Sequence, residues 1–434
     1  MKIARRELTT TGGRDATTRH ILGDSALSVC MPPNPVAPTG WRWVALSAVA
    51  EMESGHTPSR NHPEYWVGNI PWMGVRDAGK NHGGTITDTT EHTNELGIDN
   101  SSARLLPAGT VCLSRGGTVG YVVMLGRQMA TSQGFANWIC GNELDPTFLK
   151  YLFLSEINAL HRFSIGATIQ TIYYPDLKAF HVCIPPLAEQ QRIVGLLDEA
   201  FEGLATAKAN AEKNLQNARA LFESHLQSVF TQRGPEWVEK GWQTKNLGDL
   251  CDVVGGGTPP KDKPAFYSGD IPWATVRDMR QDVITETEFR ITKDAVKSSA
   301  TNIIPSGNVV IATRVGLGKV CLIGQDTAIN QDLRGIVPRS DKALVVRYLY
   351  WWLKSIADVI VAEGTGATVQ GVKLPFVKSL QIPVPPLAEQ QRIVDLLDSL
   401  HEETHRLARL YERKHAALEA LKKSLLHQAF TGEL

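Results

Sequence analysis

The sequence predicts an α+β fold: two similar mixed α/β domains separated by two long helices that form an antiparallel coiled coil, related by a pseudo-two-fold internal repeat. Two observations lead to this prediction. The decapeptide PPLAEQQRIV occurs at 185–194 and again at 385–394, and the segments before the two copies resemble one another. Each decapeptide also opens a stretch with apolar residues every three or four positions, the pattern of a long helix with one apolar face.

The repeat covers most of the chain and has the size of a domain. GNIPWMGVRD (68–77) matches GDIPWATVRD (269–278), LPAGTVCLSRGGTVGYV (106–122) matches IPSGNVVIATRVGLGKV (304–320), and GATIQ (166–170) matches GATVQ (366–370). We predict a leader and linker over 1–39, a first domain over 40–184, a helix over 185–233, a second domain over 234–384 and a second helix over 385–434.

Each domain is expected to mix strands and helices. TVCLS with GYVVML, and NVVIAT with GKVCLI, predict two hairpins. Residues 145–163 predict a helix because an Asp-Pro start precedes apolar residues at helical spacing, and residues 341–360 are the counterpart in the second copy. The domains show neither an alternation of strand, helix and strand nor a nucleotide-binding fingerprint.

The decapeptide itself has the chemistry of a helix start. Pro186 stands where a helix tolerates a missing N–H group, and Glu189 places negative charge in the first turn. Gly234-Pro235 and Gly432 are typical stops. Each helix would hold about 45 residues and extend roughly 65 Å at ~1.5 Å per residue.

An apolar stripe on such a helix needs a partner. We predict that the two helices pair with each other and hold the two domains apart. The alternative is packing of each helix on its own domain, and another subunit could pair with the helices in addition to their pairing with each other. The predicted seam consists of Ile193, Leu196, Leu197, Ala200, Phe201, Leu204, Leu215, Leu221, Phe222, Leu226 and Val229 in the first helix, and Ile393, Leu396, Leu397, Leu400, Leu407, Leu410, Ala417, Leu418, Leu421 and Leu425 in the second.

Composition and charge restrict the class of protein. The 434 residues have an ordinary globular composition, no apolar run of the ~18 residues that span a bilayer, and no apolar core of a secretory signal near the start, so we expect a cytoplasmic protein. The six cysteines are far apart and lack C-x-x-C spacing, which predicts free thiols. The 45 basic and 45 acidic residues argue against a protein that wraps nucleic acid alone, but allow a DNA reader that shares phosphate contacts with partner subunits.

On these motifs the chain resembles the DNA-specificity subunit (HsdS) of type I restriction–modification systems. The resemblance rests on the duplicated PPLAEQQRIV before a long helix, GNIPW and GDIPW, GHTP and GGTP, the repeated GAT-x-Q, and the terminal QAFTGEL, and it covers residues 40–434. The leader GRDATTRHILGDSALSV is also similar to one seen in this family.

The resemblance implies a non-catalytic subunit with two target-recognition domains that read a bipartite, asymmetric site on double-stranded DNA. It implies that the helices act as spacer and dock two methyltransferase subunits, which methylate an adenine in each half-site, and that restriction–translocase subunits complete a phage-defence enzyme. Because methylation requires the base to leave the duplex, that chemistry would belong to the partners. No cofactor is expected on this chain, while S-adenosylmethionine, ATP and Mg are expected on the partner subunits.

The duplication separates two kinds of candidate DNA-contacting residue. Positions identical in both copies cannot distinguish two half-sites, so we expect them to build the scaffold or contact phosphates. These are Thr57, Arg76, Arg115, Thr168 and Gln170 in the first copy and Thr258, Arg277, Arg314, Thr368 and Gln370 in the second. Arg76 and Arg277 could instead pair with Asp77 and Asp278, and Trp72 and Trp273 are expected in the core.

Polar positions that differ between the copies are expected to read bases, since Arg and Lys suit guanine while Asn and Gln suit adenine. Taken singly, each could also be a solvated surface side chain. The candidates are Lys80, Asn81, His82, Arg127, Gln128 and Gln133 in the first domain, and Arg280, Gln281, Arg290, Lys293, Asn330 and Arg334 in the second.

One motif points to a different function. HEETH at 401–405 has the H-E-x-x-H spacing of zinc proteases, but it lies in a predicted coiled coil, where we expect no cleft, and the first copy reads FEGLA there. We therefore expect exposed polar positions and no metal. The leading hypothesis is a DNA-recognition subunit. The alternatives are a coiled-coil scaffold whose globular ends bind proteins and, more remotely, a metalloprotease.

Overall fold

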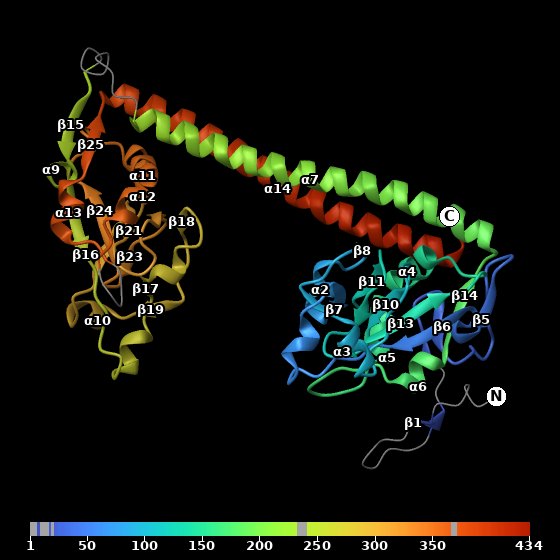
Figure 1. The fold of residues 1–434 in the computed structure, drawn as a ribbon. Coiled ribbons are helices and arrows are strands. Elements are labelled where there is room, and N and C mark those ends of the chain that lie inside the picture. The colour runs from blue at the N-terminus through green and yellow to red at the C-terminus, as the bar shows by residue number, and fades with distance from the viewer. Residues whose placement is uncertain (1–6, 9–16, 19–20, 232–240, 366–370) are drawn as a thin grey trace. The chain divides into compact units, whose positions relative to one another are not determined.

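The computed structural model describes residues 7–8, 17–18, 21–231, 241–365 and 371–434. They form two compact units, residues 1–210 with 414–434 and residues 211–413. Each unit contains one globular domain and a part of both long helices (Figure 1). The predicted end of the first helix at Gly234-Pro235 lies outside the described residues.

The first domain is built on a five-stranded sheet in the order β6-β13-β10-β11-β8 beside a three-stranded sheet, β12-β7-β9. The hairpin predicted from TVCLS and GYVVML is confirmed as the antiparallel pair β10–β11. The strands are β6 (Ala50–Ser54), β7 (Ile70–Met73), β8 (Thr85–Ile86), β9 (Glu91–Thr93), β10 (Val111–Ser114), β11 (Val122–Leu125), β12 (Ala130–Thr131) and β13 (Phe135–Cys140). The helices are α1 (Leu46–Val49), η1 (Pro63–Trp66), α2 (Val75–Lys80), α3 (Glu95–Asp99), α4 (Pro146–Ser155), α5 (Ile157–Phe163) and α6 (Tyr174–Lys178).

Part of the predicted leader belongs to this domain. β3 (Ile21–Leu22) and β4 (Leu27–Val29) join β14 (Phe180–Ile184) and β5 (Arg42–Ala45) in a four-stranded sheet of order β3-β4-β14-β5. All three residues of β4 are buried. Residue 39 is therefore no boundary of the folded unit. Further upstream, β1 (Glu7–Leu8) pairs with β2 (Thr17–Thr18).

The second domain repeats the same plan. Its sheets have the orders β16-β24-β21-β22-β18, β19-β17-β23-β20 and β15-β25, and the predicted hairpin is the antiparallel pair β21–β22. The strands are β15 (Gln243–Asn246), β16 (Cys251–Gly255), β17 (Ile271–Ala274), β18 (Val283–Ile284), β19 (Phe289–Ile291), β20 (Asn302–Ile304), β21 (Val309–Ala312), β22 (Val320–Ile323), β23 (Thr327–Ile329), β24 (Leu333–Pro338) and β25 (Gln381–Val384). The helices are α9 (Leu247–Leu250), η2 (Pro264–Tyr267), η3 (Val276–Asp278), α10 (Lys293–Lys297), α11 (Val346–Ser355), α12 (Ala357–Ala362) and α13 (Leu374–Ser379).

The helix predicted over 145–163 is two helices, α4 and α5. Asp145 begins α4 as predicted, because its carboxylate accepts hydrogen bonds from the backbone N–H groups of Thr147 and Phe148. The backbone leaves helical geometry at Glu156 (φ −98°, ψ 17°), and α11 and α12 are divided in the same way at Ile356. Periodicity alone did not reveal this break, because the apolar spacing continues through it.

The cysteines are free, as predicted, and five of the six are buried. Burial raises the pKa of the Cys183 and Cys251 thiols to about 12, so both remain protonated at neutral pH. Within the described ranges, none of the helices combines the length and the hydrophobicity needed to cross a bilayer.

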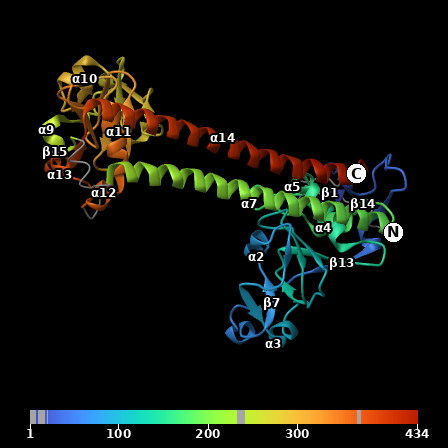
Figure 2. The ribbon, with the colours of Figure 1, turned by 90° about the horizontal axis from the view of Figure 1, so that it is seen from above.

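The long helices α7 (Leu187–Thr231) and α14 (Leu387–Thr431) have 45 residues each, and within each unit they run antiparallel (Figure 1 and Figure 2). In the first unit, the Nζ atom of Lys208 lies 2.9 Å from Oε1 of Glu419. In the second unit, Nη2 of Arg219 lies 3.8 Å from Oε1 of Glu412. The predicted antiparallel pairing is confirmed.

Both helices also pack on the globular domains, so the alternative of helix–domain packing is realised together with the pairing. Phe430 of α14 lies 5.0 Å, between ring centroids, from Phe148 of α4, and Ile193 and Leu197 of α7 belong to the same core cluster. Five leucines of the predicted seam are instead 42–65% exposed. They are Leu196, Leu221, Leu396, Leu410 and Leu421. The apolar stripe predicted from helical spacing is therefore wider than the stripe that the helix pair buries.

The repeated decapeptide fastens each helix to its domain through a buried glutamine. The Gln190 side chain is fully buried, accepts a hydrogen bond from the Asp145 N–H at 2.9 Å, and donates to the carbonyls of Glu143 and Pro185 at 2.9 Å each. Gln390 makes the same three bonds, to the N–H of Val345 and to the carbonyls of Ala343 and Pro385. The repeated decapeptide therefore forms the same attachment between helix and domain in both halves of the chain.

We expect Gln390→Leu to lower the free energy of unfolding of the second unit by about 2 kcal/mol, because the substitution removes the partner of three backbone groups, of which the Pro385 carbonyl is buried and the other two are partly buried. Thermal and urea unfolding of the full chain measures the change. Gln391→Leu is the matched control: its exposed amide only contacts Asp395, so the effect should stay within about 0.5 kcal/mol. Equal effects of the two substitutions would show that the buried joint contributes nothing.

Candidate nucleic-acid interface

The second domain has a cavity of about 570 Å³ at which three of the predicted residues, Thr258, Arg277 and Asn330, meet. Aromatic rings form much of its wall, and a lysine, a glutamine and an aspartate complete it. The lining residues are Thr258, Lys261, Tyr267, Trp273, Thr275, Val276, Arg277, Phe289, Val315, Asn330, Gln331 and Asp332. Flat apolar faces next to donors and acceptors are what a nucleobase requires.

A buried tryptophan supports the cavity wall. Trp273 is 5% exposed and donates its indole N–H to the Gly257 carbonyl at 3.1 Å, while the rings of Tyr267 and Phe289 lie edge-on to it at 6.0 and 6.2 Å. Trp72 is equally buried in the first domain and bonds to the His56 carbonyl. The prediction that both tryptophans are core residues is confirmed.

Local capping turns Arg277 outward. Asp278 accepts hydrogen bonds from the N–H groups of Thr275 and Glu288, so its carboxylate belongs to the cap of η3. The Arg277 side chain is 75% exposed, and its guanidinium lies 3.6 Å from the Glu288 carboxylate. The alternative pairing of Arg277 with Asp278 is therefore not the arrangement found. Arg76 occupies the same place at the start of α2 and is also exposed.

A threonine–glutamine hydrogen bond recurs in both domains. Thr57 donates its hydroxyl to the amide oxygen of Gln133, and Thr258 donates to that of Gln331. Gln133 therefore has a repeat partner, and its assignment to the divergent positions is wrong. Aligning TSQGF (131–135) with INQDL (329–333) makes the two glutamines equivalent. The neighbouring residues differ too much for this alignment to be recognised from the sequence.

The two domains differ most where Trp72 and Trp273 face the neighbouring strand. Trp72 lies opposite Glu91, whereas Trp273 lies opposite Phe289. Arg60 packs its guanidinium 3.7 Å from the Trp66 ring centroid and forms an ion pair with Glu91 that holds the pKa of this carboxyl below its usual range.

Tyr267 and Lys261 stand in the second domain where Trp66 and Arg60 stand in the first. Sequence reasoning missed these positions, although aligning HTPSR with GTPPK indicates Arg60 and Lys261. For Glu91 and Phe289, only the strand register reveals the equivalence, because the segments before β9 and β19 share few letters.

The remaining repeated residues that the structure describes are Arg115, Arg314, Thr168 and Gln170. Arg115 is an internal brace: its guanidinium donates to the Ile172 carbonyl at 3.2 Å and stacks 4.1 Å from the Tyr174 ring centroid. Arg314 is exposed, 3.6 Å from Asp332. Thr168 and Gln170 occupy an exposed loop. Their counterparts Thr368 and Gln370 lie outside the described residues.

Several divergent candidates lie away from this place. Asn81 follows α2 and donates its amide to the Asp77 carbonyl. His82 accepts a hydrogen bond from the Val122 N–H and lines a cavity of about 600 Å³ together with Lys422 and His427 of α14. Partial burial lowers the pKa of His82. Three further candidates of the first domain, Lys80, Arg127 and Gln128, are exposed.

In the second domain, Asn330 is the divergent candidate at the 570 Å³ cavity; it is nearly buried and bonds to Asp332. Arg334 donates to the carbonyls of Gln331 and Leu333, and burial lowers the pKa of its guanidinium. Arg280 and Gln281 line a separate cavity of about 430 Å³. The remaining exposed candidates are Arg290, which bonds to the Asp270 carbonyl, and Lys293, which begins α10.

The family model for the type I restriction modification DNA specificity domain matches the chain twice, over residues 38–215 and 239–412. The specificity subunit of the type I restriction enzyme MjaIX from Methanocaldococcus jannaschii is 24% identical over 413 residues, 92% of this chain and 94% of that protein. The EcoR124I/EcoR124II specificity subunit from Escherichia coli is 35% identical over 219 residues, 49% of this chain and 52% of that protein.

Two solved structures share the fold. The HsdS subunit from Thermoanaerobacter tengcongensis has a TM-score of 0.62, 22% identity, and coverage of 93% of this chain and 99% of its own. A chain from a study of complex assembly and conformational transition of the type I R-M system has a TM-score of 0.74, 22% identity, and coverage of 92% and 100%. Both likenesses extend over nearly the whole of each chain.

Proposed function

The chain belongs to the type I restriction modification DNA specificity family, and from this premise we propose that its two domains read the two halves of a bipartite, asymmetric DNA site. Its role in the complex is DNA recognition and is not catalytic. The family model matches once in each half of the chain, so one half-site for each domain is the simplest assignment.

Two unlike half-sites are supported by side chains that differ between the domains at equivalent positions. Each domain has the same threonine–glutamine bond and the same outward arginine, Arg76 or Arg277. Beside this common frame, the first domain presents the charged pair of Arg60 and Glu91, while the second presents Lys261 and Phe289. A common frame can hold the phosphates, and the differing side chains can select bases.

The test is a change in one half of the methylated motif. Phe289→Ala combined with Lys261→Gln should relax the half-site of the second domain, and Glu91→Ala the half-site of the first. Each base-edge contact contributes about 1–3 kcal/mol of discrimination, so preference at the affected position should fall about 5- to 150-fold. The readout is sequencing of methylated adenines after reconstitution with methyltransferase subunits.

Asn142→Ala, which changes an exposed side chain elsewhere in the first domain, is the control and should leave the motif unchanged. A shift of both half-sites by one variant, or unchanged motifs with all variants, would reject the assignment of one half-site to each domain. A coiled-coil scaffold that binds only proteins would leave no DNA footprint.

We further propose that the helices dock two methyltransferase subunits, joined by restriction subunits. Equivalent leucines of α7 and α14 are exposed in pairs, Leu196 with Leu396 and Leu221 with Leu421, which suits two copies of one partner. The net charge of zero also favours partners that share the phosphate contacts. S-adenosylmethionine, ATP and Mg would then be bound by these subunits, in the cytoplasm.

A further inference from the structure

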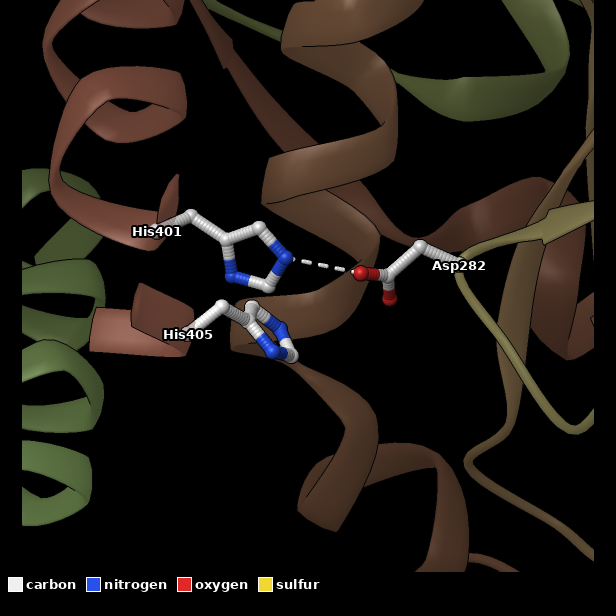
Figure 3. Close-up of side chains that lie close together, drawn as sticks. All are labelled: Asp282, His401 and His405. Carbon is white, nitrogen blue, oxygen red and sulfur yellow. Dashed lines mark hydrogen bonds and ion pairs between the residues drawn. The ribbon is translucent and has the colours of Figure 1, made fainter. Parts of the chain in front are cut away.

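Three side chains that can bind a metal ion lie together in the second unit. At this part of α14 we expected exposed polar positions and no cleft. His401 and His405 project from α14 toward Asp282, which comes from the segment between η3 and β18 (Figure 3). Their ligand atoms all lie within 4.8 Å of one another. The expectation is wrong for His401: its side chain is only 19% exposed and packs on Phe222 and Trp351. Both histidines line a cavity of about 580 Å³.

The carboxylate of Asp282 is held with one oxygen directed at the histidines. Oδ2 lies 2.7 Å from Nε2 of His401, while Oδ1 accepts from the Tyr350 hydroxyl at 2.6 Å and from the Lys354 ammonium at 2.9 Å. These three hydrogen bonds fix the orientation of the carboxylate, and metal-binding carboxylates are commonly oriented by such outer hydrogen bonds.

The first unit shows that the fold does not require histidines at this joint. At the equivalent positions of α7, 200 residues earlier, stand Phe201 and Ala205. Phe201 packs edge-on against Tyr151 with centroids 5.4 Å apart, and the ammonium of Lys422 lies 5.0 Å from the centroid of the same ring. An apolar ring thus completes the same helix–domain contact. Packing at this contact therefore does not require histidines.

We propose that His401, His405 and Asp282 form a binding site for a divalent transition ion of the zinc type, with water from the cavity completing the coordination. Histidines at positions i and i+4 lie on one helical face, and two imidazoles with a carboxylate suit Zn²⁺. Two donors about 2.1 Å from a tetrahedral ion lie roughly 3.4 Å apart. The donors here are separated by 2.7 Å to at most 4.8 Å, so small side-chain rotations bring them to that spacing.

The role of this ion is structural. It joins α14 to the segment before β18 and so fixes the helix on the second domain. A protease would need the glutamate of HEETH as general base, but Glu402 is exposed and does not line the cavity. Tyr350 and Lys354 both bond to Oδ1 of Asp282, so Oδ2, which bonds to His401 here, is the oxygen that would turn to the ion.

The test uses the full chain, freed of metal by dialysis and titrated with Zn²⁺, and with Co²⁺ as a spectroscopic probe. One equivalent of ion should bind, the cobalt form should show the visible bands of a low-symmetry site, and zinc should raise the unfolding temperature. His405→Ala should weaken binding at least about tenfold and remove the zinc-dependent thermal shift, because a ligand contributes no less than its outer hydrogen-bond partners. This variant keeps the bond between His401 and Asp282.

Two further variants make the result decisive. His427→Ala removes an exposed histidine elsewhere on α14 and should bind as the parent does. His401→Phe with His405→Ala installs the residues of the first unit, so it should fold and lose the site. Absence of saturable binding by the parent, or equal affinity in His405→Ala, would overturn the proposal; the latter would identify an adventitious ion only.

Discussion

Glu156→Ala is expected to destabilise the first unit by about 3 kcal/mol and to release residues 21–29 from its sheet. The carboxylate of Glu156 is fully buried between α4 and α5. It accepts hydrogen bonds from the N–H groups of Asp24, Ser25 and Ala26 at 2.6 to 2.7 Å, and from the Ser25 hydroxyl at 2.8 Å. Alanine would leave three backbone donors without their acceptor, and each such group costs about 1–3 kcal/mol when it stays buried.

Amide hydrogen exchange of the full chain, resolved by mass spectrometry, measures this loss locally. About 3 kcal/mol corresponds to roughly 100-fold faster exchange at residues 24–26, whereas β14 should change less. Glu143→Ala is the control, since Glu143 forms only an exposed ion pair with Arg42, and such pairs contribute about 0–1 kcal/mol. Unchanged exchange in Glu156→Ala would show that the sheet, and not the carboxylate, holds the leader.

Removing one heptad from each long helix, residues 211–217 and 412–418, is expected to abolish methylation of the native DNA site. Seven residues are nearly two helical turns, so the apolar seam stays in phase while each helix becomes about 10 Å shorter. If the helices set the spacing of the half-sites, methylation should move to a site with the same two half-sites and a gap about 3 base pairs shorter.

Genome-wide mapping of methylated adenine in cells that carry the reconstituted complex gives the gap directly. Lys208→Ala is the matched control, because it removes the ion pair with Glu419 without changing the length of either helix, and the native gap should persist. A folded, active deletion variant that keeps the native gap would exclude the helices as the spacer.

The duplication, the hairpins β10–β11 and β21–β22, and the start of each long helix at its decapeptide could all be predicted from the amino-acid sequence. These features depend on local order along the chain: alternation in strands, helical spacing, and a Pro-Pro start followed by an acidic first turn. Two apolar stripes repeated in one chain also predict that the long helices pair with each other, and the antiparallel direction that we predicted is the one found.

The contacts between distant residues could not be predicted from the sequence and are known from the fold. Glu156 bonds to a segment more than 100 residues earlier, Gln190 reaches the loop before α4, Glu91 and Phe289 face the two tryptophans through strand register, and Asp282 approaches His401 from another element. Such contacts have no period along the chain. They follow from burial, which brings polar groups together and requires each to find a hydrogen-bond partner wherever the fold places one.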